Sequence, residues 1–135
     1  MRPSDEAAPE GGLFPFGAAL LLVDSITEAP AHGSGRVVVS GSHAGASVVR
    51  YAAQAQARLA VFNDAGIGKD EAGVAALPGL QALGIAACAV GHDSACIGDA
   101  RSTFEDGVIS RCNDGARAPG TALGLRLRAW LLSES

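Results

Sequence analysis

Aromatic side chains are scarce in this sequence: they make up 4% of its 135 residues, which excludes a core built from large rings. Hydrophobic residues still account for 48% of the chain, and most of them are Ala, Val, Leu and Ile. A chain of this length buries one sizeable core, and the usual size of domains favours a single domain over two. We therefore expect one domain whose core consists of small and branched aliphatic side chains.

An excess of positive charge is also missing. Lys and Arg number 10 against 14 Asp and Glu, which gives a formal net charge of -4. Nucleic-acid binding needs a basic patch that neutralises phosphates, so we exclude nucleic acid as a partner. No apolar run approaches the roughly 20 residues of a membrane span, and the acidic start of the chain is unlike a secretory signal. These absences predict a cytoplasmic protein that binds no membrane.

The cysteines argue against two further classes. The chain has three, Cys88, Cys96 and Cys112, and no C-x-x-C pair among them. An odd number without that spacing favours neither a disulfide framework nor a structural zinc site, so we expect reduced thiols. A nearby imidazole can activate a thiol as a nucleophile, and Cys96 follows His92 closely. Residues so close along the chain rarely meet in triad geometry, however, and a structural cysteine is the simpler interpretation.

Composition divides the chain into two regions. Residues 1–12 (MRPSDEAAPEGG) are polar and show no periodicity, so we predict a flexible N-terminal arm, followed by a single domain over 13–135. Within the domain, short apolar runs alternate with helical patterns. The predicted strands are 19–23, 36–40, 59–62, 85–90 and 108–110. The predicted helices are 45–57, 70–83 (capped by Asp70 and Gly84 and kinked or split at Pro78), 99–106, and 123–131, where alternating leucines also fit a strand.

This alternation predicts an α/β fold: a mainly parallel sheet of four or five strands flanked by helices, in a three-layer arrangement of the Rossmann-like or flavodoxin-like kind. The segment between 23 and 36 contains Pro30, Gly33 and Gly35 and leaves no room for an ordinary crossover helix. We therefore expect the first strand to be antiparallel or to lie at the edge of the sheet.

Three predicted strands are followed by polar, glycine-containing loops: SGSHAG, NDAGIGKD and GHDSACIGDA. In open α/β sheets, ligands bind outside the carboxyl ends of the strands, where parallel strands bring such loops together. The opposite edge carries short loops without titratable clusters. The candidate catalytic residues are His43, His92, Asp64 and Asp93. The candidate ligand-binding residues are Ser40, Ser42, Asn63, Gly66, Gly68, Lys69 and Ser94.

The chemistry of these residues suggests proton transfer to or from an anion. Imidazole titrates near neutral pH, so His43 and His92 are the candidate acids or bases, oriented by Asp64 or Asp93. Loop amides and Lys69 suit a carboxylate or phosphate. The loop NDAGIGKD, residues 63–70, is not a P-loop, which would need Gly at 63 and Ser or Thr at 70. It also does not match the dinucleotide-binding pattern G-x-G-x-x-G.

Each candidate also has a structural interpretation. Serines after a strand satisfy backbone groups, glycines serve turns, and an aspartate before a helix caps it. His43, Asp64 and His92 are ordinary metal ligands, but no H-x-H or H-x-x-x-H spacing supports a site, so we predict no cofactor and keep a divalent metal as a weaker alternative.

Two functional hypotheses remain open. The first is a small acid–base enzyme, an isomerase, hydrolase or lyase, that acts on a small anionic metabolite. The second is a non-catalytic ligand-binding domain or the small subunit of a larger enzyme. Short α/β chains often assemble, so a homo-oligomer or a larger partner subunit fits either hypothesis.

Overall fold

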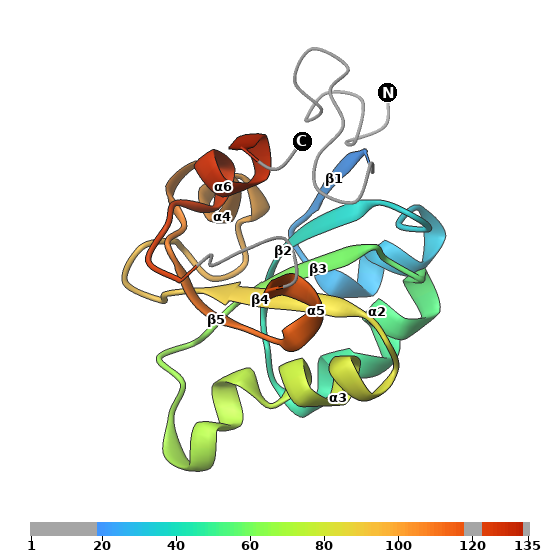
Figure 1. Cartoon of the computed structure of the whole chain (residues 1–135), viewed down its shortest axis with the longest axis horizontal. Coiled ribbons are helices and arrows are strands. Elements are labelled where there is room, and N and C mark those ends of the chain that lie inside the picture. The colour runs from blue at the N-terminus through green and yellow to red at the C-terminus, as the bar shows by residue number, and fades with distance from the viewer. Residues whose placement is uncertain (1–18, 118–122, 134–135) are drawn as a thin grey trace.

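The computed structural model describes residues 19–117 and 123–133, so the arm predicted at 1–12 lies outside the described residues. The chain forms a five-stranded sheet with the strand order β1-β2-β3-β4-β5 (Figure 1). The first four strands run parallel, and the fifth pairs antiparallel with the fourth. The strands are β1 (Leu20–Val23), β2 (Val37–His43), β3 (Leu59–Asn63), β4 (Ala86–Val90) and β5 (Ile109–Cys112).

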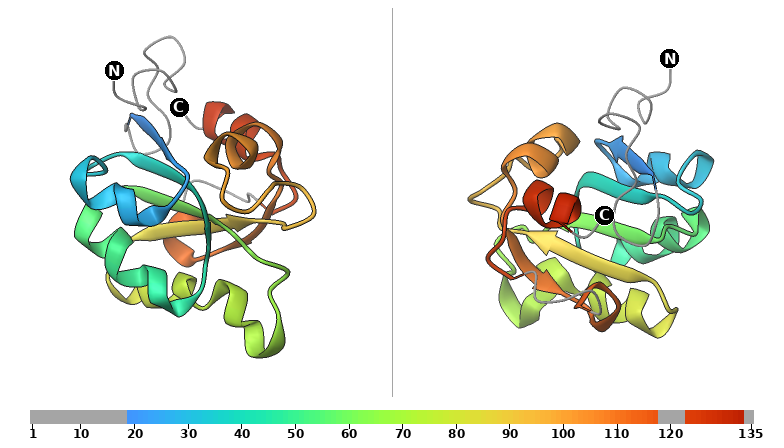
Figure 2. Two further views of the ribbon diagram at one scale, coloured as in Figure 1. Left: turned by 180° about the vertical axis from the view of Figure 1, so that it is seen from behind. Right: turned by 45° about the horizontal axis from the view of Figure 1, so that its top comes forward.

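Helices cover both faces of this sheet, so the predicted three-layer α/β fold is confirmed (Figure 2). One face packs against η3 (Ile26–Ala31), η4 (Ala46–Val48), α2 (Val49–Ala55), η5 (Lys69–Val74) and α3 (Ala76–Ala82). The other face packs against α4 (Ala100–Asp106), α5 (Asp114–Arg117) and α6 (Leu127–Ser133). None of the helices in the described part of the chain has the length and apolar character needed to cross a membrane.

The central strands are apolar on both faces because both faces are covered. In β2, Val37 and Val39 enter the core layer beneath α4 and α6, whereas Val38 enters the layer beneath α2 and α3. All five residues of β3 and all five of β4 are buried. The alternation of a strand thus divides one continuous apolar run between two cores.

The first strand lies at the edge of the sheet, which confirms one of the two expectations for it. The other expectation, that this strand runs antiparallel, is wrong. β1 pairs parallel with β2, from Leu20 opposite Val37 to Val23 opposite Ser40. The crossover between them is the six-residue 3₁₀ helix η3, which Ser25 and Glu28 start with a capping box. A 3₁₀ helix rises about 2 Å per residue, so this short segment returns the chain along the strand without a full α-helix.

The helix predicted over 70–83 is interrupted near Asp70 and Glu71 and not at Pro78, so the kink or split predicted at Pro78 is wrong, and Asp70 does not cap the helix. Its φ of 56° lies in the left-handed region, and the α-helix begins only at Ala76, which leaves Pro78 within the first turn where proline is tolerated. At the other end Gly84, with φ 78°, donates its N–H to Gln81, and Ile85 donates to Leu80. These two hydrogen bonds form the Schellman motif, which confirms the predicted C-cap glycine.

The helix predicted over 123–131 is present from Leu127 onward, and the described residues just before it form a single bridge and no strand. Arg126 forms an antiparallel bridge with Val108, and helix α6 begins at the next residue, Leu127. The helix predicted over 99–106 is confirmed as α4: the Asp99 side chain accepts a hydrogen bond from Ser102 N–H at 3.0 Å, as an N-cap does.

Candidate functional site

The loops after β2, β3 and β4 meet at the carboxyl edge of the sheet, because these three strands are parallel neighbours. Backbone hydrogen bonds join them directly. Ala44 donates to Asn63, Asp64 donates to Val90, and Gly98 donates to Gly41. The segment 91–98 therefore lies across the ends of the strands, and the expected convergence of the three loops is present.

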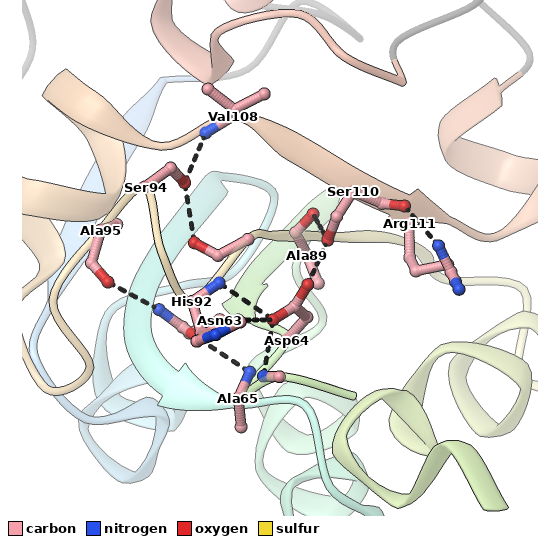
Figure 3. Close-up of polar contacts among 12 residues, drawn as sticks. Asn63, Asp64, Ala65, Ala89, His92, Ser94, Ala95, Val108, Ser110 and Arg111 are labelled. Carbon is pink, nitrogen blue, oxygen red and sulfur yellow. Dashed lines mark hydrogen bonds and ion pairs between the residues drawn. The ribbon is translucent and has the colours of Figure 1, made fainter. Parts of the chain in front are cut away.

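Asp64 is the centre of this edge (Figure 3). The residue is only 4% exposed, and its carboxylate accepts three hydrogen bonds. Oδ1 accepts from the backbone N–H of Gly66 at 2.8 Å and of His92 at 3.0 Å. Oδ2 accepts from the Ser110 hydroxyl at 2.7 Å. One side chain thus ties together the segments that follow β3 and β4 with strand β5.

The preceding residue, Asn63, anchors the same turn from inside. It is fully buried. Its Oδ1 accepts from Ala65 N–H at 2.8 Å, and its Nδ2 donates to the carbonyl of Ala95 at 3.2 Å. Asn63 and Asp64 therefore form two successive Asx turns, in which a side-chain oxygen accepts from the amide two residues ahead. The sequence Asn-Asp after a buried strand is what allows the chain to turn so tightly here.

Ser110 is the residue that the sequence analysis missed. β4 and β5 pair Ala89 with Arg111 and then Val90 with Ile109, so Ser110 is an extra residue on β5. Such a β-bulge redirects a side chain, and here it directs the hydroxyl toward Asp64. The only signal in the sequence is a serine within a short apolar strand, which by itself does not indicate a bulge.

Two opposing effects set the acidity of Asp64. Burial, the larger single effect, raises the pKa, whereas the hydrogen bonds from Ser110, Gly66 and His92, with the charge of His92, lower it. The donors together outweigh burial, so the pKa of Asp64 lies below its ordinary value of 3.8. Asp64 is therefore a carboxylate at neutral pH and a permanent hydrogen-bond acceptor.

His92 is the titratable partner of this carboxylate. Its ring nitrogen Nδ1 lies 3.5 Å from Asp64 Oδ1, and its side chain is 58% exposed. One side of the ring faces Gly66, where a Cβ atom would lie 3.7 Å from Nδ1 and Cε1. The backbone N–H of His92 is fixed by the same Asp64 oxygen. One ring nitrogen thus lies within ion-pair distance of the carboxylate, while more than half of the side chain remains exposed.

His43 does not join this pair. It ends β2 opposite Asn63, and its Nδ1 accepts a hydrogen bond from the backbone N–H of Gly45 at 3.0 Å. Among the described residues, no hydrogen bond or ion pair connects it with Asp64 or His92. β3 lies between β2, which ends at His43, and β4, which ends just before His92. Two strand spacings amount to about 10 Å. The structure therefore brings Asp64 and His92 together and leaves His43 apart.

The three candidate serines bond to the backbone. Ser40, fully buried, donates to the carbonyl of Val61 at 2.8 Å, where β2 bulges away from β3. Ser42 accepts from Ile26 N–H at 2.9 Å. Ser94 donates to the Gly91 carbonyl and accepts from Val108 N–H. These contacts match the structural interpretation of a serine after a strand.

The loop after Asp64 is strained. Ala65, Ile67, Asp70 and Glu71 all have φ between 52° and 67°, a region that residues with a Cβ rarely adopt. The amides of Gly66 and Gly68 bond within the loop, to Asp64 Oδ1 and to the Gly66 carbonyl. The loop amides that were expected to bind a carboxylate or phosphate therefore bond within the loop instead. Lys69, on the same loop, and Asp93, beside His92, are exposed.

Within the described residues, no three His, Cys, Asp or Glu side chains are placed to hold a metal ion together. Comparisons of the chain with protein-family models, with curated proteins and with solved structures gave no match. The site must therefore be interpreted from its own geometry.

Proposed function

We propose that this protein is an acid–base enzyme in which His92 transfers a proton to or from a small anionic metabolite and Asp64 orients the imidazole. The observation that supports it most is the placement of His92 Nδ1 at 3.5 Å from the buried carboxylate, with the rest of the side chain largely exposed. Asp64 attracts a proton to Nδ1, which leaves Nε2 able to accept one from a substrate or from water. The reaction class is an isomerisation, hydrolysis or elimination.

Two exposed cations on neighbouring segments would suit an anionic substrate. Lys69 lies on the strained loop whose Gly66 faces the His92 ring, and its side chain is exposed. Arg111 follows the bulge, is exposed, and donates from Nη1 to the Ser110 carbonyl at 3.0 Å. An anionic ligand whose carboxylate or phosphate reached either cation would gain charge-assisted hydrogen bonds from it.

The test is a turnover screen of small carboxylates and phosphates, followed by ¹H NMR, on the wild type and two matched variants. His92→Gln keeps a polar side chain but removes the proton-transfer group, and we expect a loss of about 10²–10⁴-fold in rate. His32→Gln, in an exposed loop, serves as the control and should keep the wild-type rate. Turnover that persists in His92→Gln would refute the assignment.

A binding module or the small subunit of a larger enzyme is the second candidate. One observation favours it: all four candidate hydroxyl and amide side chains at this edge are bonded to backbone groups of the protein itself, namely Ser40, Ser42, Asn63 and Ser94. Thermal stabilisation of the wild type by one of the screened anions without turnover, weakened in Lys69→Ala, would support this candidate instead. Either function fits a cytoplasmic protein, as a homo-oligomer or with a partner subunit.

A further inference from the structure

A second chemical feature lies beside this site: two cysteines face each other across β4 and β5. Cys88 and Cys112 are direct Cα partners in the antiparallel ladder. Both belong to the core layer beneath α4 and α6, so their side chains leave the sheet on the same face. Both are reduced in the structure.

The hydrogen-bond pattern fixes the spacing of this pair. Asn113 donates its backbone N–H to the carbonyl of Ala87 at 2.9 Å, so Ala87 and Asn113 are a hydrogen-bonded pair. Hydrogen-bonded and non-hydrogen-bonded pairs alternate along an antiparallel ladder, and Cys88 and Cys112 are therefore a non-hydrogen-bonded pair. Such pairs have their Cα atoms about 4.5 Å apart, which falls inside the range of about 4.4–6.8 Å that a disulfide spans.

The two thiols already interact. The hydrogen bond with Cys112, followed by burial, raises the pKa of Cys88 well above its usual range. Cys88 is fully buried and keeps its proton, whereas Cys112 lies on the edge strand and remains 7% exposed. A small oxidant therefore reaches the thiol of Cys112 before the thiol of Cys88.

We propose that Cys88 and Cys112 form a reversible disulfide in response to hydrogen peroxide. The Cys112 sulfur attacks the peroxide, so that an S–O bond forms, the O–O bond breaks, and one water leaves with the thiol proton. The Cys88 sulfur then attacks Cys112: the S–S bond forms, the S–O bond breaks, and a second water carries away the Cys88 proton. Two thiols are oxidised by two electrons, and one peroxide is reduced to two waters.

This bond would connect the redox state to the candidate site, although it does not depend on the proposed function. It closes a loop over residues 89–111, which contains the segment 91–98, helix α4 and the bulged Ser110 that donates to Asp64. A disulfide stabilises a fold by restricting the unfolded chain, and more so for a longer loop. Oxidation should therefore stabilise the domain and restrain the segment that carries His92.

The experiment uses the full chain with Cys96→Ser, which removes the exposed third thiol. The protein is treated with hydrogen peroxide, and its intact mass and thiol content are measured before and after reduction with dithiothreitol. We expect the mass to fall by two hydrogen atoms, both thiols to disappear, and the urea midpoint to rise, all reversed by the reductant. Peptide mapping should place the bond between Cys88 and Cys112.

Two single variants in the same background, Cys88→Ala and Cys112→Ala, provide the controls, and the fluorescence of the buried Trp130 verifies that each is folded. Neither variant should lose two hydrogens, and Cys88→Ala should instead gain oxygen on Cys112. Two outcomes would overturn the proposal: both thiols surviving peroxide in the folded Cys96→Ser protein, or oxygen added there without an S–S bond.

Discussion

Replacing Asp64 by Asn tests whether the carboxylate charge holds the candidate site together. Asn keeps one oxygen to accept from the amides of Gly66 and His92, and its NH₂ group can donate to the Ser110 hydroxyl, so the shape of the network survives. What is lost is the charge on three hydrogen bonds. Bonds to charged groups contribute about 1.5–3 kcal/mol each against about 1 kcal/mol for neutral ones, and relief from burying a charge offsets part of the difference. We expect Asp64→Asn to lower the free energy of unfolding by about 2–3 kcal/mol at pH 7.

The loss must also depend on pH, with a sign that the structure determines. The pKa of Asp64 in the folded protein lies below its ordinary value of 3.8. A depressed folded-state pKa gives a stabilisation that is complete above the unfolded-state pKa and disappears as the pH falls through the folded-state value. The stability difference between wild type and Asp64→Asn should therefore be constant from pH 7 to about 5 and shrink below about pH 4.

The assay is urea unfolding at several pH values, followed by fluorescence of Trp130, the one tryptophan of the chain, which is 1% exposed. Asp93→Asn is the matched control, because it removes an exposed carboxylate from the adjacent loop and should change stability little at any pH. A loss below about 0.5 kcal/mol in Asp64→Asn, or a loss of the same size at pH 3 and pH 7, would refute the reasoning.

Three smaller perturbations test the elements around this network. Ser110→Ala removes the strongest of the donors to Asp64, so ¹³C NMR titration should show a raised pKa for that carboxyl, and an unchanged titration would contradict the bulge geometry. Asp99→Ala removes the N-cap of α4 and should lower the free energy of unfolding by about 1 kcal/mol, while Asp99→Ser should retain most of it. Gly41→Ala would place a Cβ 2.3 Å from the backbone nitrogen of Asp99. Thermal unfolding should register about 1–3 kcal/mol of destabilisation, whereas a neutral result would mean that segment 91–98 does not lie against β2.

The layer structure of the domain could be predicted from the sequence because strands that are buried on both faces consist of continuous apolar runs. Uninterrupted apolar runs of four residues in β3 and of five residues in β4 stand between polar segments, and parallel strands covered on both faces have this pattern. The prediction was poorer where a local rule competed with a tertiary contact. Asp70 resembles an N-cap, yet Gly73 donates to the Ile67 carbonyl at 2.6 Å and closes the preceding loop, which holds Asp70 in a left-handed conformation.

The meeting of the three loops could be predicted from the sequence, but the contacts of the candidate residues could not, because two bulges influence them. β2 has two extra residues relative to β3 between Val39 and His43, and the Ser40 hydroxyl in this stretch donates to the Val61 carbonyl. β5 inserts Ser110 and turns its hydroxyl to Asp64. A one-residue change of register moves a side chain to the opposite face of a sheet, so an unmarked bulge exchanges structural and functional candidates.

The polar contacts at this edge distinguish the side chains that bond to the backbone from the pair formed by Asp64 and His92. Ser40, Asn63 and Ser94 are bonded to carbonyl or amide groups of neighbouring segments, and such contacts satisfy buried backbone atoms that would otherwise destabilise the fold. Asp64 differs because its acceptors join three segments and also face a titratable ring. A carboxylate that only tied loops together would need no imidazole beside it. The exposed His92 is therefore the group whose presence the scaffold does not explain, and it is the one that a functional assay should remove first.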